Sequence, residues 1–295
     1  MLIQLLISGI MLGGVYALTS IGLSLIFGVS KIVNFAHGDF VVVGMYITYT
    51  VYQAMGLSPY LSWIVVIPCS ILLGYLVFLL LKRTIGVQEV NQIFITLGLS
   101  MVIQNVLLMV FKSDYRTIRT IFKNNIKIGE IFLTREGLLA ILIAIVITVV
   151  FLWFLNKTDT GRAMKAVSQD RSAAHLMGVR VGSIDLLVFC LGIVFAGIAG
   201  SLLITMFAAY PTSGGVYNLL AWVTVVMGGL GNVVGALFAA FLIGVIEIVS
   251  GYYLGADMRQ VVYYVFFVII LILRPQGLFS GIKFLNRKVK TNEAR

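Results

Sequence analysis

The sequence VYNLLAWVTVVMGGLGNVVGALFAAFLIGVIEIVS occupies residues 216–250 and carries one charged side chain, Glu247, in 35 residues. A membrane-spanning helix needs about 20 apolar residues, so this stretch is too long for one straight span and short for two full ones. Glycines at positions 228, 229, 231 and 235 interrupt its middle. The pattern predicts a helical hairpin bent at these glycines, made of two short spans or a re-entrant pair.

The rest of the chain has the same character. Of 295 residues, 60% are hydrophobic and 11% are charged, against roughly 25% charged in a soluble domain. This composition excludes a soluble enzyme, a disordered chain and a disulfide-stapled secreted domain. We predict an all-α polytopic membrane protein with about eight transmembrane helices, a broken glycine-rich hairpin and a cytoplasmic helix pair. The other apolar segments are 2–30, 40–55, 60–81, 91–111, 137–155, 184–209 and 259–273.

Basic residues predict the orientation. If the loop at 156–183 and the basic tail at 282–295 are cytoplasmic, 14 of the 21 Lys and Arg residues lie inside and the N-terminus lies outside. No Lys or Arg precedes Lys31, so we expect the first apolar segment to be a retained span and not a cleaved signal peptide. The net charge of +10 then reflects orientation and contact with anionic lipid, with no need for a nucleic-acid partner.

The loop at 156–183 has the pattern of two short helices. Asp159 or Thr160 is positioned to cap the first helix, Ser168 or Asp170 the second, and Gly178 suits the left-handed position after its end. Small and basic residues on these helices suit docking into a groove of a soluble partner. An amphipathic helix pair lying on the lipid surface explains the same pattern equally well.

Motifs for hydrolysis or nucleotide binding are absent from the sequence. It contains no phosphate-binding loop, no zinc-type His-Glu-x-x-His helix and no Gly-x-Ser-x-Gly elbow. We therefore predict no enzymatic activity, no metal site and no cofactor in this chain. Uphill transport would need an ion gradient or a partner ATPase.

Polar residues are densest at Asn34, His37 and Asp39, which either line a transport path or form a structural turn at the start of a helix. The glycines at 228–235 either expose helix N-termini to a substrate carboxylate or serve only as a packing hinge. Glu247 is placed to meet a substrate ammonium group, although an interfacial acid or an ion pair is the simpler interpretation.

Four segments together resemble the permease family of branched-chain amino acid ABC importers. They are the Gly-Arg-Ala-x-x-Ala-Val pattern from Gly161, Asn-Phe-Ala-His-Gly from Asn34, the glycine hairpin from Gly228 and Arg-Pro-Gln-Gly-Leu-Phe from Arg274. Their order and spacing match from Gly9 to about Gly281. Phe35 favours amino acids over urea, because the related urea permeases tend to carry Met there. Asn232 departs from the small residue usual at that position.

The resemblance implies that the chain, residues 1–295, is a single transmembrane permease domain of a bacterial cell-membrane importer. It would carry branched-chain or similar apolar amino acids inward, with urea or a small sugar as the alternative substrate and an ion-coupled transporter as the alternative class. The implied partners are a second, related permease, two ATP-binding subunits and an extracytoplasmic binding protein. The expected coupling residues are Gly161, Arg162, Lys165, Ala166, Asp170, Ala173 and Gly178. The expected path residues are Asn34, His37, Asp39, Gly228, Gly229 and Asn232.

Overall fold

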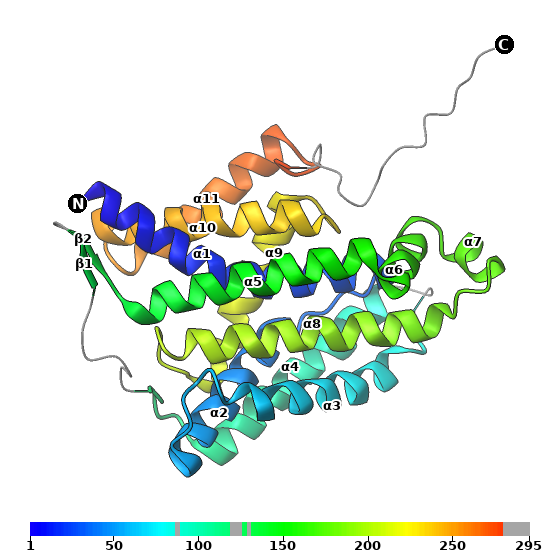
Figure 1. Ribbon diagram of the computed structural model, residues 1–295, viewed down its shortest axis with the longest axis horizontal. Coiled ribbons are helices and arrows are strands. Elements are labelled where there is room, and N and C mark those ends of the chain that lie inside the picture. Colours follow the sequence, from blue (N-terminus) through cyan, green and yellow to red (C-terminus); the bar gives the residue numbers. More distant parts are fainter. Residues whose placement is uncertain (86–88, 119–125, 129–130, 280–295) are drawn as a thin grey trace.

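The computed structural model describes residues 1–85, 89–118, 126–128 and 131–279 (Figure 1). The basic tail predicted at 282–295 lies outside these residues. Long helices make up most of the described chain: α1 (Leu2–Leu25), α2 (His37–Met55), α3 (Trp63–Leu81), α4 (Glu89–Phe111), α5 (Arg135–Lys157), α8 (Val181–Leu203), α9 (Gly214–Gly228), α10 (Val233–Leu254) and α11 (Met258–Leu273). Two short helices, α6 (Asp159–Gln169) and α7 (Arg171–Leu176), connect α5 to α8. Strands β1 (Ile126–Ile128) and β2 (Ile131–Leu133) form one small antiparallel hairpin.

Six of the described helical segments are long and apolar enough to cross a membrane: those at Leu2–Ser30, Trp63–Leu81, Glu89–Phe111, Arg135–Lys157, Val181–Leu203 and Val233–Leu254. The predicted all-α polytopic membrane fold is therefore confirmed, while the count of about eight spans stays a prediction. The sixth segment was expected to continue to Ala209, but α8 ends at Leu203. Beyond it the backbone of Ala209 pairs with that of Arg116 in an isolated antiparallel bridge.

Helix α1 lies at the centre of the fold, because most of its apolar residues are buried inside the protein. Glycines allow its backbone to approach α10 closely. A Cβ atom on Gly9 would lie 2.5 Å from the Cα of Val245, and one on Gly13 would lie 2.6 Å from the Cα of Phe241. The two helices are antiparallel, since the contacts advance along α1 as they retreat along α10. Small residues commonly provide such close approach between helices in membranes.

The glycine-rich stretch forms the predicted bent hairpin. Helices α9 and α10 are separated by residues 229–232, where Gly229 and Gly231 have φ values of 96° and 78° that favour glycine. With 22 residues, α10 is about 33 Å long and spans a bilayer core, whereas the 15 residues of α9 reach only about 22 Å. The hairpin thus combines one full span with one short helix.

The bundle has two distinct ends. Figure 1 shows the N-terminus, β1, β2 and the connection between α10 and α11 at one end, and α6 and α7 at the other. Along its sides, α4 and α11 carry rows of exposed apolar side chains such as Phe94, Met109 and Ile272. Exposed apolar helix faces suit contact with lipid or with another membrane subunit.

Candidate functional site

The helix pair α6–α7 is formed by local capping. Thr158, and not Asp159 or Thr160, caps α6: its backbone is extended and its Oγ1 accepts a hydrogen bond from the Gly161 amide at 3.0 Å. Asp159 and Thr160 are instead the first helical residues. Asp170 caps α7 as predicted, because its carboxylate accepts from the amides of Ser172 and Ala173. Gly178 has a φ of 83° after α7, also as predicted.

Helix α6 packs tightly onto the end of α5. A Cβ on Gly161 would lie 2.5 Å from the carbonyl oxygen of Phe154, so a larger side chain would push the two helices apart. Ala166 is half-buried against the core on the same helix. Lys165 donates to the side chain of Asn156, and its partial burial lowers the pKa of its ammonium group. Arg162 points outward and pairs with the exposed carboxylate of Asp159.

Helix α7 projects away from the bundle and carries two exposed apolar side chains. Leu176 and Met177 are 86% and 84% exposed at its C-terminal end. Ala173 is exposed beside them, while Ala174 is buried. This apolar pair was not among the residues predicted from the sequence. The signal was available, since two large apolar residues stand immediately before the helix-ending Gly178 outside any span.

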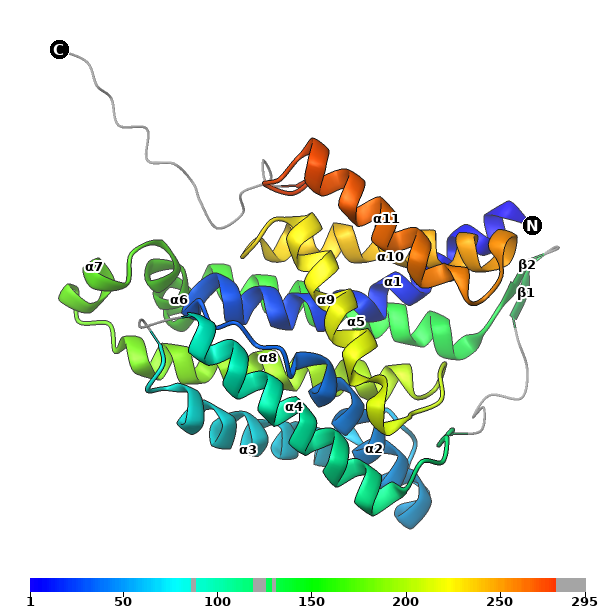
Figure 2. The same cartoon turned by 180° about the vertical axis from the view of Figure 1, so that it is seen from behind.

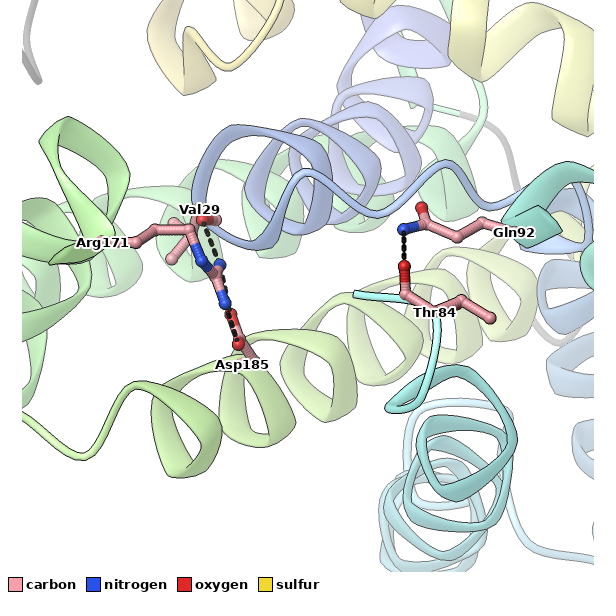
Figure 3. Close-up of polar contacts among 5 residues, drawn as sticks. All are labelled: Val29, Thr84, Gln92, Arg171 and Asp185. Carbon is pink, nitrogen blue, oxygen red and sulfur yellow. Dashed lines mark hydrogen bonds and ion pairs between the residues drawn. The ribbon is translucent and has the colours of Figure 1, made fainter. Parts of the chain in front are cut away.

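Arg171 connects the helix pair to the membrane bundle (Figure 3). Its guanidinium donates to both carboxylate oxygens of Asp185 on α8, at 3.0 and 2.6 Å, and lies 3.5 Å from the carbonyl oxygen of Val29. Val29 belongs to a π-helical turn, Ile26–Ser30, that ends α1. The Asp185 side chain is 3% exposed and that of Arg171 is 33% exposed. One arginine thus joins α7, α8 and the end of α1, and we call this contact the arginine clasp.

The chain after α1 runs back into the bundle without regular structure. Lys31 takes a left-handed conformation with φ 55°, and α2 begins only at His37. Side chains of α4 satisfy the amides of this segment: Val33 donates to Gln92 at 2.9 Å and Phe35 to Thr96 at 3.1 Å. Gln92 in turn donates to the carbonyl oxygen of Thr84 (Figure 3). Non-helical backbone inside a membrane bundle needs such protein partners.

This return places the polar residues Asn34, His37 and Asp39 inside the protein, at most 1% exposed. The His37 Nε2 lies 3.0 Å from the carbonyl oxygen of Thr19 in α1, and Asp39 accepts from Gln104 at 2.9 Å. Within the described residues, Asn34 Nδ2, His37 Nδ1 and Asp39 Oδ2 are buried without a hydrogen-bond partner. Unmet polar atoms are rare in native proteins and call for an explanation at each site.

The glycine break does not join this polar cluster. Helix α9 starts beside it, since a Cβ on Gly38 would meet the backbone of Gly214, but α9 ends at Gly228, about 20 Å further along. Gly228 packs against the backbone of Ala236, and Gly229 against that of Gly277. The six predicted path residues therefore fall into two separate groups.

Asn232 lies in the second group and has structural contacts. Its side-chain oxygen accepts from the Gly235 amide at 3.1 Å and caps α10, and its Nδ2 donates to the carbonyl oxygen of Phe279 at 2.9 Å. A Cβ on Gly231 would lie 2.9 Å from the Cα of Gly28, which sets the break against the π-helical end of α1. These contacts support the packing-hinge interpretation of the break.

Comparison with known proteins gives matches over nearly the whole chain. The family described as "Branched-chain amino acid transport system / permease component" matches residues 5–272. The high-affinity branched-chain amino acid transport system permease proteins BraD of Pseudomonas aeruginosa and LivH of Escherichia coli K12 are 26% and 25% identical, each over 94% of this chain and 95% of the relative. The fructose import permease protein FrcC of Rhizobium meliloti is 32% identical over 43% of this chain and 36% of its own. No solved structure matches. The match over residues 5–272 shows that the chain belongs to the family of branched-chain amino acid transport permease components.

Proposed function

We propose that this chain is the membrane subunit of an ABC importer that moves branched-chain amino acids inward, with ATP bound and hydrolysed by partner subunits. The family match over residues 5–272 carries this proposal. Relatives named for branched-chain amino acid transport align over 94% of the chain, whereas the fructose permease aligns over 43%. A sugar substrate is therefore less well supported. The chain itself catalyses no reaction in this proposal, which fits the lack of a phosphate-binding loop in its sequence.

The proposed orientation puts α6 and α7 in the cytoplasm and the N-terminus outside. The excess of basic residues at 156–183 favours this direction over the reverse. An extracytoplasmic binding protein would then deliver substrate at the end of the bundle that holds the N-terminus. Residues 1–295 act as one permease domain, with 156–183 as its coupling loop and exposed apolar helix faces for lipid and a second permease.

Coupling to ATP begins at α7 in this proposal. Leu176 and Met177 enter a groove of an ATP-binding subunit, because an exposed apolar pair on a projecting helix suits insertion into a partner. Asp170 and Gly178 fix the two ends of α7, and Ala173 leaves room for close approach. Gly161, Lys165 and Ala166 hold α6 against the bundle, and Arg162 remains at the surface for the partner.

The arginine clasp then passes the movement into the membrane. A shift of α7 displaces Arg171, which holds both Asp185 on α8 and the carbonyl of Val29 at the end of α1. The non-helical segment that follows α1 leads to the buried cluster of Asn34, His37 and Asp39. The unmet polar atoms of the cluster supply groups that can change partners between inward-open and outward-open states.

Transport by the reconstituted complex tests this function. The chain would be combined with a second permease, two ATP-binding subunits and the binding protein in proteoliposomes, and uptake of labelled leucine would be measured. We expect uptake that needs ATP and every partner and is competed by valine and isoleucine but not by ribose or urea. Uptake of ribose or urea in place of leucine would refute the substrate assignment, and leucine uptake by this chain alone on an ion gradient would refute the transporter class.

A further inference from the structure

A cavity of about 250 Å³ is lined by residues of α1, α9, α10 and α11, helices whose arrangement Figure 2 shows. Its polar walls come from Glu247 on α10, Arg259 on α11 and Tyr16 on α1. Phe207, Ala208, Val216 and Ala256 add apolar surface, and Ser213, Tyr217 and Gln260 add further polar groups. The volume is just below the range of about 300–1,000 Å³ usual for drug-sized ligands, so the cavity suits a small metabolite.

Glu247 is an acid buried in an apolar helix. Glu247 is 8% exposed, and Tyr16, which is 3% exposed, lines the same cavity. The second carboxylate oxygen, Oε2, is buried with no hydrogen-bond partner in the described part of the chain. A buried carboxylate in a membrane bundle is costly unless a cation or donor meets it, and such residues mark functional sites.

Arg259 supplies positive charge to the same cavity without pairing with Glu247. Among the described residues no ion pair joins the two, which corrects the simpler interpretation of Glu247 as half of an ion pair. The stem of Arg259 crosses Gly251, where a Cβ would lie 2.5 Å from its Cδ, and its Nε donates to the carbonyl oxygen of Ala256 at 3.0 Å. An acid and a base therefore face one small, partly apolar space while remaining separate.

We propose that this cavity binds a zwitterionic α-amino acid, with its ammonium group at Glu247, its carboxylate at Arg259 and its apolar side chain against Phe207 and Val216. One carboxylate and one guanidinium lining the same cavity match the two charges of such a ligand. The inference rests on the proposed function only for the branched side chain of the ligand. The charges of Glu247 and Arg259 favour an amino acid without reference to that function.

The cavity adjoins the buried polar cluster. Ser213 lines it, and the next residue, Gly214, packs against Asp39. Tyr16 lies one helical turn before Thr19, whose carbonyl oxygen contacts His37. The cavity and the cluster therefore lie close together, and we place the cavity on the outer side of a path that continues through the predicted path residues Asn34, His37 and Asp39.

Equilibrium binding to the purified complex, without the binding protein, tests the site. The probes are labelled L-leucine, 4-methylpentanoate, which lacks the ammonium group, and 3-methylbutylamine, which lacks the carboxylate. We expect either analogue to bind about tenfold or more weakly than leucine, because each leaves one charged group of the cavity unpaired. Equal binding of leucine and 4-methylpentanoate would overturn the role of Glu247, and no variant is needed for that comparison.

Variants test whether Glu247 meets the ammonium group of the ligand and Arg259 its carboxylate. Glu247→Gln should weaken leucine binding about tenfold and strengthen 4-methylpentanoate binding, because that ligand no longer leaves a carboxylate unpaired. Arg259→Gln should likewise weaken leucine binding and strengthen 3-methylbutylamine binding. Asp257→Asn removes an exposed carboxylate two residues from Arg259 and should change neither ligand. A complex that takes up leucine with ATP but binds leucine equally well after Glu247→Gln would overturn the site and leave the proposed function intact.

Discussion

The two side chains of the arginine clasp should contribute unequally to the stability of the protein, so removing Arg171 should cost more than removing the charge of Asp185. Arg171→Gln leaves the carboxylate of Asp185, which is 3% exposed, without its counterion. Breaking a buried ion pair from one side costs 3–5 kcal/mol, and because the Arg171 side chain is 33% exposed we expect the lower end, about 3 kcal/mol. Asp185→Asn leaves behind only an arginine that can turn toward water, so it should cost about 1 kcal/mol.

The double variant tests whether the loss of stability comes from the unpaired carboxylate of Asp185 or from some other effect of the substitution at Arg171. With Arg171→Gln and Asp185→Asn together, no buried charge remains, so the double variant should be more stable than Arg171→Gln alone. Thermal unfolding of the purified complex measures these differences. Arg180→Gln, at an exposed arginine of the same loop, is the matched control and should change stability by less than about 0.5 kcal/mol.

Function gives the second measurement on the same variants. If the clasp passes movement from α7 to the end of α1, Arg171→Gln should lower leucine uptake per ATP hydrolysed while basal ATP hydrolysis continues. The clasp would have no such role if the two single variants lost equal stability or if the losses added in the double variant. An unchanged ratio of uptake to ATP hydrolysis would show that Arg171 does not transmit the movement.

Three further predictions concern packing and docking. Gly161→Ala should destabilise the complex by about 2 kcal/mol, because the new Cβ meets backbone of α5, whereas Gly182→Ala, with open space around it, should be neutral or slightly stabilising in the same unfolding assay. Leu176→Ser combined with Met177→Ser should change the free energy of unfolding by less than about 0.5 kcal/mol, since both side chains are exposed. The same double variant should weaken binding of the ATP-binding subunits at least about tenfold in a pull-down titration. Gly13→Ala should cost about 2 kcal/mol by separating α1 from α10, and an unchanged unfolding temperature would contradict the packing described for these helices.

Local features of the fold were predictable from the sequence. Most of the apolar segments, the bend at the glycines and the caps at Asp170 and Gly178 depend on residues close together in the chain, and the structure confirms them. The segment expected at 184–209 instead ends as a helix at Leu203. The cap of α6 was misplaced by one or two residues, because Thr158, Asp159 and Thr160 are all good capping residues and only backbone geometry separates them.

Contacts between distant residues were not predictable in the same way. Arg171 and Val29 are 142 residues apart, and no periodicity or composition brings them together. The depth of the Asn34 cluster depends on Lys31 taking a left-handed conformation, which is unusual for a residue other than glycine. The sequence favoured an interfacial or ion-paired Glu247, and only the packing of α1, α9, α10 and α11 shows that Glu247 and Arg259 line one cavity.

Photo-crosslinking shows whether α7 docks on an ATP-binding subunit, as we propose. A benzoylphenylalanine would replace Met177, which is 84% exposed, and in a separate protein Tyr115, which is 73% exposed near the other end of the bundle. Illumination of the assembled complex should join position 177 to an ATP-binding subunit and leave position 115 unattached to it. Crosslinking of position 115 to that subunit, or none from position 177 in a complex that hydrolyses ATP, would contradict the account.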